Sequence, residues 1–213
     1  MRIEFQNVIP NPMAGQHLAA SELWGKSIVF EPGEKVLLKA PSGTGKSTFH
    51  SYVCGIRTDF SGAIQYGGIS FSSISLNTWA AFRATKLGLV FQDLKLIPEL
   101  RVKENLLLKN KLTNRFTEEE ILRFLDELGI KEKWNQPCGE LSFGQQQRVA
   151  IVRSLLQPFN WLIADEPFSH LDDENANKAM ALMLRRVKEE NAGFMILSLG
   201  SSHGESFSKT IVL

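Results

Sequence analysis

The sequence predicts an α/β fold, organised as a single domain over residues 1–213. Short apolar segments the size of strands alternate along the chain with segments of helical periodicity. One predicted strand runs directly into a glycine-rich turn that begins a helix, and a second, buried strand ends in two adjacent carboxylates. No internal repeat or low-complexity linker divides these elements, so we expect them to form one unit.

The composition is that of a globular protein with a substantial core, since 43% of the residues are hydrophobic and 22% are charged. The net charge of +1 gives no basic field, so no nucleic-acid partner is expected. Cys54 and Cys138 match no metal-ligand spacing, which favours a reducing compartment. No apolar run approaches the roughly 18 residues that a membrane span needs, and the N-terminus has no signal-peptide pattern. A role at a membrane would therefore require docking from the cytoplasmic side.

Strands dominate the predicted elements of the N-terminal half. Residues 2–8 alternate polar and apolar side chains, with Ile3 and Phe5 on one face of a half-buried strand, and two prolines make 9–13 a loop. The other elements predicted here are strands at 27–30, 35–39, 62–66 and 87–91, a helix-like stretch that follows the glycine-rich turn and runs to Cys54, and a helix directly after Gln92.

Helices alternate with buried strands in the C-terminal half. Thr117 and Glu120 form a capping-box pattern, and Gly129 is the expected end of the helix that they begin. The other elements predicted here are a helix at 145–156, a strand at 161–164, a helix with an apolar stripe from Ala176 to Val187 that ends at Gly193, and strands at 194–199 and 210–213.

The glycine-rich turn predicts a phosphate-binding loop. It reads Ser42-Gly43-Thr44-Gly45-Lys46-Ser47-Thr48. Glycines let backbone N–H groups converge on phosphate oxygens, and the helix N-terminus adds partial positive charge. Lys46 would reach the β- and γ-phosphates of a nucleotide, and Ser47 would bind Mg²⁺. A chance glycine-rich turn is the alternative, but strand, loop and helix all fall in place. Ala40 replaces the first glycine of the pattern, which is tolerable if its φ is negative.

The paired carboxylates Asp165 and Glu166 follow the buried strand at 161–164. Asp165 is predicted to hold Mg²⁺ through water, and Glu166 to orient and polarise an attacking water. A solvated acidic turn is the alternative for this pair alone, and the phosphate-binding loop upstream disfavours it.

A third motif places a second anion-binding site at the start of a helix. Leu141-Ser142-Phe143-Gly144-Gln145 offers a hydroxyl, backbone N–H groups and a helix N-terminus. A plain N-cap with a polar first turn is the alternative. Two phosphate-binding helix N-termini in one chain suggest that the second contacts a nucleotide held elsewhere.

The order of these motifs resembles the ATP-binding cassette (ABC) family over nearly the whole chain. The matching residues are the loop of Lys46, Gln92 after a strand, the Leu-Ser-x-Gly-Gln stretch, the Asp-Glu pair and Ser169-His170-Leu171-Asp172. The resemblance implies a homodimer or pseudo-dimer in which ATP lies between one phosphate-binding loop and Ser142, Gly144 and Gln145 of the other copy. It also implies that Gln92 binds Mg²⁺, senses the γ-phosphate and relays to the membrane partner, and that it is catalytic, acting with Glu166 on the attacking water. Asp172 is implied to contact the nucleotide from a loop that crosses the interface.

The resemblance also implies an architecture: a P-loop NTPase core with a small antiparallel β lobe and an inserted helical lobe at about 99–159. Residues 91–98 with Glu104-Asn105 look most like the lipoprotein-releasing, macrolide-export and cell-division cassettes. The expected function is the ATP-hydrolysing subunit of a membrane transporter, without a membrane span of its own. It would be cytoplasmic and peripheral on the inner face of the cell membrane, docked to an integral membrane permease. Force transmission without cargo and a scaffold with little turnover remain alternatives.

Three positions depart from the family pattern. Phe143 stands where the signature normally has a glycine, and residues 9–13 lack the aromatic that stacks on adenine, which leaves an apolar or proline surface for the base. Gly200 stands about where the switch histidine belongs, and His203 lies three positions further on. His203 is either a solvated surface residue, which we favour, or a relocated catalytic residue.

These alternatives for His203 predict different kinetics. If His203 is a surface residue, His203→Ala changes turnover by less than about twofold, as exposed substitutions do. A general acid–base or positioning group at the γ-phosphate would contribute about 10²–10⁴-fold. Steady-state phosphate release in the presence of the permease decides between them, and a hundredfold loss would make His203 catalytic.

Overall fold

The computed structural model describes residues 1–15, 20–41, 43–199 and 204–213. The strands of this part are β1 (Ile3–Pro10), β2 (Ser27–Phe30), β3 (Lys35–Lys39), β4 (Phe60–Tyr66), β5 (Ile69–Ser70), β6 (Leu87–Val90), β7 (Trp161–Asp165), β8 (Gly193–Ser198) and β9 (Lys209–Val212). The α-helices are α1 (Lys46–Val53), α2 (Leu76–Thr85), α3 (Val102–Asn110), α4 (Glu118–Glu127), α5 (Phe143–Ser154) and α6 (Asp173–Glu189). Short 3₁₀ turns occupy Asn11–Met13, Phe71–Ser73, Lys131–Lys133 and Cys138–Glu140.

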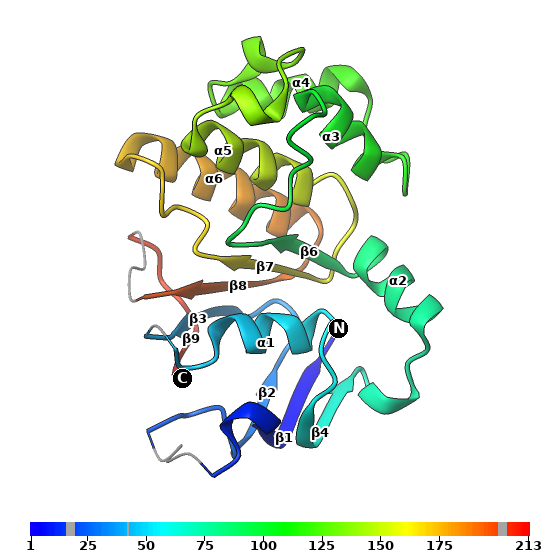
Figure 1. The fold of residues 1–213 in the computed structure, drawn as a ribbon, viewed down its shortest axis with the longest axis vertical. Coiled ribbons are helices and arrows are strands. Elements are labelled where there is room, and N and C mark those ends of the chain that lie inside the picture. Colours follow the sequence, from blue (N-terminus) through cyan, green and yellow to red (C-terminus); the bar gives the residue numbers. More distant parts are fainter. Residues whose placement is uncertain (16–19, 42, 200–203) are drawn as a thin grey trace.

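A parallel sheet with the order β6-β7-β8-β3-β9 forms the centre of the molecule (Figure 1). Every residue of β7 and β8 is buried, as expected for strands covered on both faces. The sheet brings β3 and β7, which precede the two sequence motifs, to either side of β8. Their carboxyl ends therefore lie close together at one edge of the sheet.

An antiparallel sheet with the order β2-β1-β4-β5 forms the second layer, which confirms the predicted small antiparallel β unit. The register between β1 and β4 shifts between Gln6 and Ile9. At this bulge, a Cβ on Gly62 would stand 2.4 Å from the carbonyl oxygen of Asn7, and Gly62 has a φ of 86°. Only glycine fits this close approach of two backbones.

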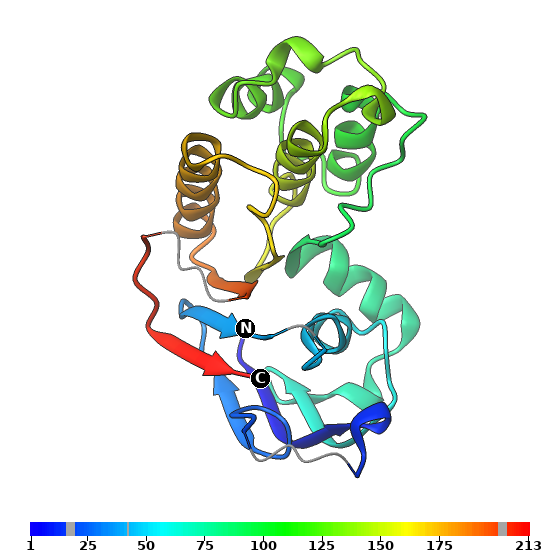
Figure 2. The same cartoon turned by 60° about the vertical axis from the view of Figure 1, so that its left-hand side comes forward.

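Two hydrophobic cores hold the layers together. One lies between the sheets around α1, where Phe49 packs against Phe5 with ring centroids 5.4 Å apart. The other lies on the opposite face of the parallel sheet and includes buried residues of α3, α4, α5 and α6. Figures 1 and 2 show these helices gathered at one end of the molecule and the antiparallel sheet at the other. The helix α1 follows the predicted phosphate-binding loop, and its buried residues pack between the parallel and the antiparallel sheet.

The structure departs from the predicted elements in several places. No helix follows Gln92 directly: Leu94 and Lys95 have φ values of 57° and 52°, and α3 begins only at Val102. Helix α2 was not predicted, and α5 begins two residues earlier than expected, at Phe143. Gly193 does not end α6 but is the first residue of β8, where a Cβ would stand 2.5 Å from the Trp161 ring.

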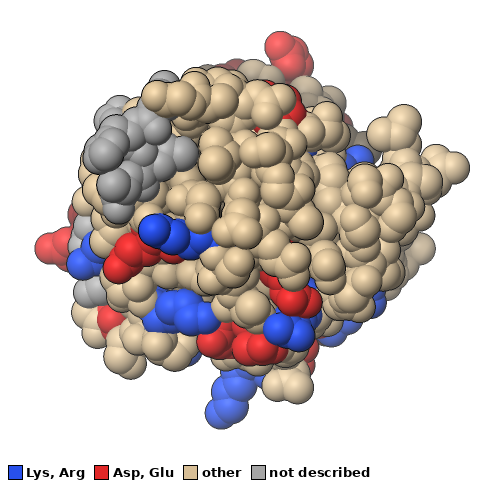
Figure 3. Space-filling model, turned by 90° about the horizontal axis from the view of Figure 1, so that it is seen from below, with Lys and Arg blue, Asp and Glu red and all other residues tan. Residues whose placement is uncertain are grey.

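Among the described residues, no helix combines the length and apolarity that crossing a bilayer requires. Figure 3 shows Lys and Arg interspersed with Asp and Glu along one side of the face seen from below, with uncharged surface beside them. Charges of both signs on this face agree with the small net charge of the chain.

Candidate functional site

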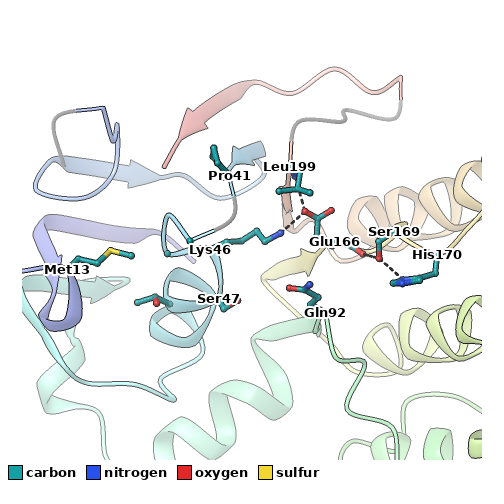
Figure 4. Close-up of a pocket in the computed structure, with 12 residues that line it drawn as sticks. Met13, Pro41, Lys46, Ser47, Gln92, Glu166, Ser169, His170 and Leu199 are labelled. Carbon is teal, nitrogen blue, oxygen red and sulfur yellow. Dashed lines mark hydrogen bonds and ion pairs between the residues drawn. The ribbon is translucent and has the colours of Figure 1, made fainter. Parts of the chain in front are cut away.

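A cavity of about 460 Å³ lies where the turn before α1 meets the carboxyl end of β7 (Figure 4). It is lined by Met13, Pro41, Gly43, Gly45, Lys46, Ser47, Thr48, Gln92, Glu166, Ser169, His170 and Leu199. The structure therefore brings together most of the phosphate-binding loop, Gln92 and Glu166, which are far apart in the sequence.

The turn before α1 takes a shape that requires its glycines. Gly43 and Gly45 have φ values of 84° and 98°, in the left-handed region that favours glycine. Thr44 closes the turn through its hydroxyl, which donates to Pro41 O at 2.8 Å, while the buried Trp24 donates from Nε1 to Thr44 O at 3.0 Å. The φ of Ala40 is not positive. An alanine is therefore tolerable where the phosphate-binding pattern has its first glycine. Ser42 lies outside the described residues.

Lys46 is the first residue of α1, and its ammonium group faces both carboxylates of the second motif. Its Nζ lies 2.6 Å from Glu166 Oε1 and 3.6 Å from Asp165 Oδ1. In Figure 4 the side chains of Lys46 and Glu166 point toward each other beside Leu199. Lys46 is thus a nearly buried cation that is compensated within the cavity, as a buried charge must be.

Glu166 is held in an unusual conformation by several contacts. Its φ of 47° is rare for a residue with a side chain and costs on the order of 1–3 kcal/mol. Its Oε1 also accepts the backbone N–H of Leu199 at 2.9 Å. Its carbonyl oxygen accepts Gln147 Nε2 at 3.0 Å and Ser169 Oγ at 3.2 Å. The surrounding bonds therefore fix where the carboxylate stands in the cavity.

Asp165 is buried, with 2% of its surface exposed, and its Oδ1 accepts no hydrogen bond in the described structure. Burial raises its pKa to about 6, and the nearby charge of Lys46 opposes this shift. His50 of α1 brings Nδ1 to 3.8 Å from Asp165 Oδ2, and burial lowers the pKa of this imidazole to about 4. His50 is therefore neutral near pH 7. Asp165 lines an adjoining hollow together with Ser47, His50 and Gln92.

The raised pKa of Asp165 predicts a stability that depends on pH. Because the folded-state pKa of about 6 lies above the usual 3.8, the native state binds more protons between these values and loses stability as pH rises through them. Without nucleotide or metal, Asp165→Asn should raise the free energy of unfolding by about 2–3 kcal/mol at pH 7.5, and by little near pH 4. Urea unfolding in EDTA at several pH values measures this.

The exposed Asp126 supplies the control for that experiment. Asp126→Asn loses only a surface contact of 3.6 Å to Lys131, so its effect should be within about 0.5 kcal/mol at any pH. If the free energies of unfolding of Asp165→Asn and the parent protein differ by the same amount at every pH, burial does not raise the pKa of Asp165 as stated.

His170 was not assigned a site role from the sequence, although it lies within the quoted Ser169–Asp172 stretch. It lines the cavity, and its Nδ1 lies 2.8 Å from Ser169 Oγ. Its ring packs on Phe143 with centroids 4.2 Å apart. The buried Gln147 accepts the backbone N–H of His170 at 3.1 Å and so joins α5 to this loop. Contacts of this kind between distant segments leave no local sequence signal.

The residues of the third motif do not line this cavity. Ser142 is the N-cap of α5, and its side chain and that of Gln145 bond each other's backbone N–H groups at 3.3 and 3.0 Å. Gly144 is packed so closely that a Cβ would stand 2.7 Å from His170 O. Asp172 caps α6 by accepting the Asn175 N–H at 2.8 Å, and this bond lowers its pKa. Within one chain, Ser142, Gln145 and Asp172 therefore serve to cap helices.

Two predictions from the sequence remain, the surface on which adenine rests and the role of His203. Of residues 9–13, Met13 lines the cavity and the prolines Pro10 and Pro12 do not, so the surface for adenine stays a prediction. Gly200 and His203 lie outside the described residues, so the prediction for His203 stays a prediction.

Comparisons with known proteins show the family of this chain. A family model described as "ABC transporter" matches residues 24–169. The Lipoprotein-releasing system ATP-binding protein LolD 1 of Rhodopirellula baltica is 32% identical over 203 residues, which cover 92% of this chain and 88% of the relative.

Two solved structures share the fold of this chain. The dimeric structure of the bacterial ABC transporter cassette MJ0796 superposes with a TM-score of 0.85 at 27% identity, covering 99% of this chain and 94% of that one. The post-hydrolysis dimer of MJ0796, bound to ADP and Pi, gives a TM-score of 0.84 with the same identity and coverage. With its motifs, its cavity and its match to the family model over most of its length, the chain belongs to the ABC transporter family, as an ATPase domain.

Proposed function

We propose that this ABC ATPase powers a lipoprotein-releasing type of membrane transporter, as a dimer docked to a separate integral membrane permease. The observation that best supports ATP hydrolysis is the position of the Lys46 ammonium group, which lies between Glu166 and Asp165 in a cavity lined by the phosphate-binding loop. Relatives with the lipoprotein-releasing name support the transporter type. Docking to a permease would place the protein at the cytoplasmic, inner face of the cell membrane.

The loop from Ser42 to Thr48 is proposed to hold the phosphates of ATP. Gly43 leaves open space where a Cβ would stand, which permits a close approach, and the N-terminus of α1 favours an anion. A γ-phosphate would compete with Glu166 for Lys46 Nζ, because both are anionic acceptors of the same ammonium group. Binding of ATP would then release the Glu166 carboxylate to orient and polarise the attacking water.

The residues present fit Mg²⁺. The donors would be the Ser47 hydroxyl, the Gln92 amide oxygen and Asp165, whose buried Oδ1 has no hydrogen-bond partner in the described structure. Within the described ranges, no group of three or more His, Cys, Asp and Glu residues forms an all-protein metal site. A few oxygen donors beside phosphates suit Mg²⁺, which keeps several waters. Mg²⁺ would neutralise charge on the β- and γ-phosphates.

Ser142, Gly144 and Gln145 are proposed to contact the nucleotide held by the other copy. They lie outside their own chain's cavity, at the N-terminus of α5, and the related MJ0796 cassette forms a dimer. The Asp172 carboxylate is already bound to the N–H of Asn175 at the start of α6. Its role in the dimer would therefore be to position the preceding loop, which contains Ser169 and His170. Residues 99–159 are proposed to act as the helical lobe of one nucleotide-binding domain.

Purification from membranes and mass spectrometry of the partners test the proposed transporter. A multi-span partner with a substrate cavity supports transport, whereas a partner dominated by an extracytoplasmic domain supports force transmission. ATP turnover by the purified assembly separates both from a scaffold with little turnover, and its absence would contradict the proposed function.

A further inference from the structure

A buried histidine, His50, lies beside the proposed metal donors and has no part in the function proposed above. It stands three residues after Ser47 in α1, so both side chains leave the helix on the same side. The adjoining hollow, of about 520 Å³, is lined by His50 together with Ser47, Gln92 and Asp165, which are the three proposed donors to Mg²⁺. The fold therefore brings a nitrogen atom to a site whose other donors are oxygens.

The imidazole of His50 is buried and incompletely paired. Its exposed fraction is 4%, and its Nε2 has no hydrogen-bond partner in the described structure. Its Nδ1 faces Asp165 Oδ2 at 3.8 Å, which is too long for a hydrogen bond. The second oxygen of Asp165, Oδ1, likewise accepts no hydrogen bond among the described residues. Buried polar atoms without partners are rare in folded proteins, so two such side chains next to each other indicate a ligand between them.

The distance between these two side chains fits a metal ion. A histidine nitrogen and a carboxylate oxygen bind a divalent ion of the first transition row at about 2.0–2.2 Å, so two such ligands of one ion lie at most about 4.2 Å apart. His50 Nδ1 and Asp165 Oδ2, at 3.8 Å, are within this limit. The ion would need little movement of either side chain.

His50 is in the protonation state that binds a metal. Burial lowers its pKa to about 4, against the opposing charge of Asp93, so the imidazole is neutral near pH 7 and has no proton to lose when it binds. The ring packs against Phe91, the residue before Gln92, with centroids 4.7 Å apart. This packing orders the ring, which holds Nδ1 toward Asp165.

Nucleotide is needed to complete the site. Within the part of the chain that the structure describes, no third His, Cys, Asp or Glu joins His50 and Asp165 to form an all-protein metal site. The Lys46 ammonium group lies 3.6 Å from Asp165 Oδ1, where it would repel a cation. A γ-phosphate that draws Lys46 away would leave the charge of Asp165 to the ion and would add phosphate oxygens as further ligands.

We infer that His50 Nδ1 is a direct ligand of the ion that accompanies ATP, so that the site takes a divalent ion of the first transition row in preference to Mg²⁺. Asp165, Ser47 and the phosphates supply the oxygen ligands. Imidazole suits ions of this row, whereas Mg²⁺ is bound through oxygens and binds here without His50. The inference rests on the proposed function, because it requires ATP in the cavity, and it adds the class of metal ion.

Pulsed electron paramagnetic resonance tests the contact directly, with Mn²⁺ as the probe. The purified full chain with Mn²⁺ and the β,γ-methylene analogue of ATP should show the spin-echo modulation of a coordinated ¹⁴N nucleus. Labelling the histidines with ¹⁵N should change the modulation frequency, which assigns the nitrogen to a histidine. His50→Gln should abolish the modulation, because an amide brings no ring nitrogen to the ion.

His170→Gln is the matched control. His170 lines the same hollow, but its Nδ1 lies 2.8 Å from Ser169 Oγ. The same substitution there should leave the modulation in place. His50→Leu is a second variant, since it removes a buried nitrogen that lacks a partner and should keep or raise the melting temperature. Its loss of the modulation could then not be attributed to unfolding.

The metal preference is measured from the dissociation constants of Mn²⁺ and Mg²⁺ in the presence of the same analogue. His50→Gln should weaken the binding of Mn²⁺ by about tenfold or more, as expected when a metal-binding histidine is lost. The binding of Mg²⁺ should change by less than about twofold, because oxygens hold this ion.

Two outcomes would overturn the inference. The first is a Mn²⁺ complex with the analogue that shows no histidine modulation, or one whose modulation is abolished by His170→Gln and kept by His50→Gln. The second is an equal loss of Mn²⁺ and Mg²⁺ affinity in His50→Gln. In both cases nucleotide and ion still bind to the parent protein, so the proposed function stands. A parent protein that binds neither the analogue nor the ion would contradict the proposed function itself.

Discussion

Glu166→Gln should abolish most ATP turnover while the protein still binds ATP. The carboxylate stands in the cavity, where it accepts hydrogen bonds from Lys46 and the Leu199 N–H, while Gln147 and Ser169 hold the backbone carbonyl oxygen of Glu166. An amide keeps the shape of the side chain but cannot accept a proton from water, and such groups typically contribute about 10²–10⁴-fold. Phosphate release should fall by this factor, and light scattering at saturating MgATP should show an accumulated dimer, because ATP remains between the two copies.

Glu174→Gln provides the control for this experiment. Glu174 lies in the first turn of α6, where it pairs with Lys178 at 2.6 Å on the surface, so turnover should change by less than about twofold. A Glu166→Gln protein that hydrolyses ATP at the parent rate would remove Glu166 from the reaction. One that stays monomeric at saturating MgATP, alone and with its permease, would contradict the proposed dimer.

Most strands of the core could be predicted because burial on both faces leaves a plain sequence signal. The residues of β7 and β8 form continuous apolar runs, and β2 and β3 begin and end where the sequence indicated. The capping box of Thr117 and Glu120 is likewise local chemistry, and it is confirmed by both of its hydrogen bonds.

The errors come from contacts between distant parts of the chain. The turn at Leu94 and Lys95 depends on Arg153, almost sixty residues away, so the local sequence could not show that no helix follows Gln92. Helix α2 has little apolar periodicity, since only Trp79 is buried within it. Gly193 looked like a helix end, but Asn191 takes the left-handed conformation there and Gly193 is required by the Trp161 ring.

The same distinction applies to the site. Lys46, Gln92 and Glu166 could be proposed from motifs because their chemistry follows from residue type and spacing, and the structure places them in one cavity. His50 and His170 carry no such motif. Their positions beside Asp165 and Phe143 depend on how α1, α5 and the loop after β7 pack together.

Lys46→Ala should weaken the binding of MgATP by about tenfold or more. The ammonium group would contribute charge-assisted hydrogen bonds to the β- and γ-phosphates, each worth on the order of 1.5–3 kcal/mol. Titration calorimetry measures the affinity directly. Lys39→Ala is the control, because Lys39 ends β3 just before the loop and does not line the cavity. Its affinity should stay within about twofold.

The ion pairs of Lys46 predict a second effect of the same substitution. Lys46 Nζ is the cation that faces both Glu166 and Asp165, so alanine leaves two neighbouring carboxylates without a counter-charge in a largely buried site. The nucleotide-free variant should therefore be less stable than the parent protein at pH 7.5. The deficit should shrink as pH falls toward 6, because loss of the Lys46 charge raises the pKa of Asp165 further and the variant takes up this proton before the parent protein does. Equal MgATP affinity in the variant and the parent would contradict the phosphate-binding role, whereas a weaker affinity with unchanged stability would show that Lys46 serves the nucleotide but does not stabilise the carboxylate pair.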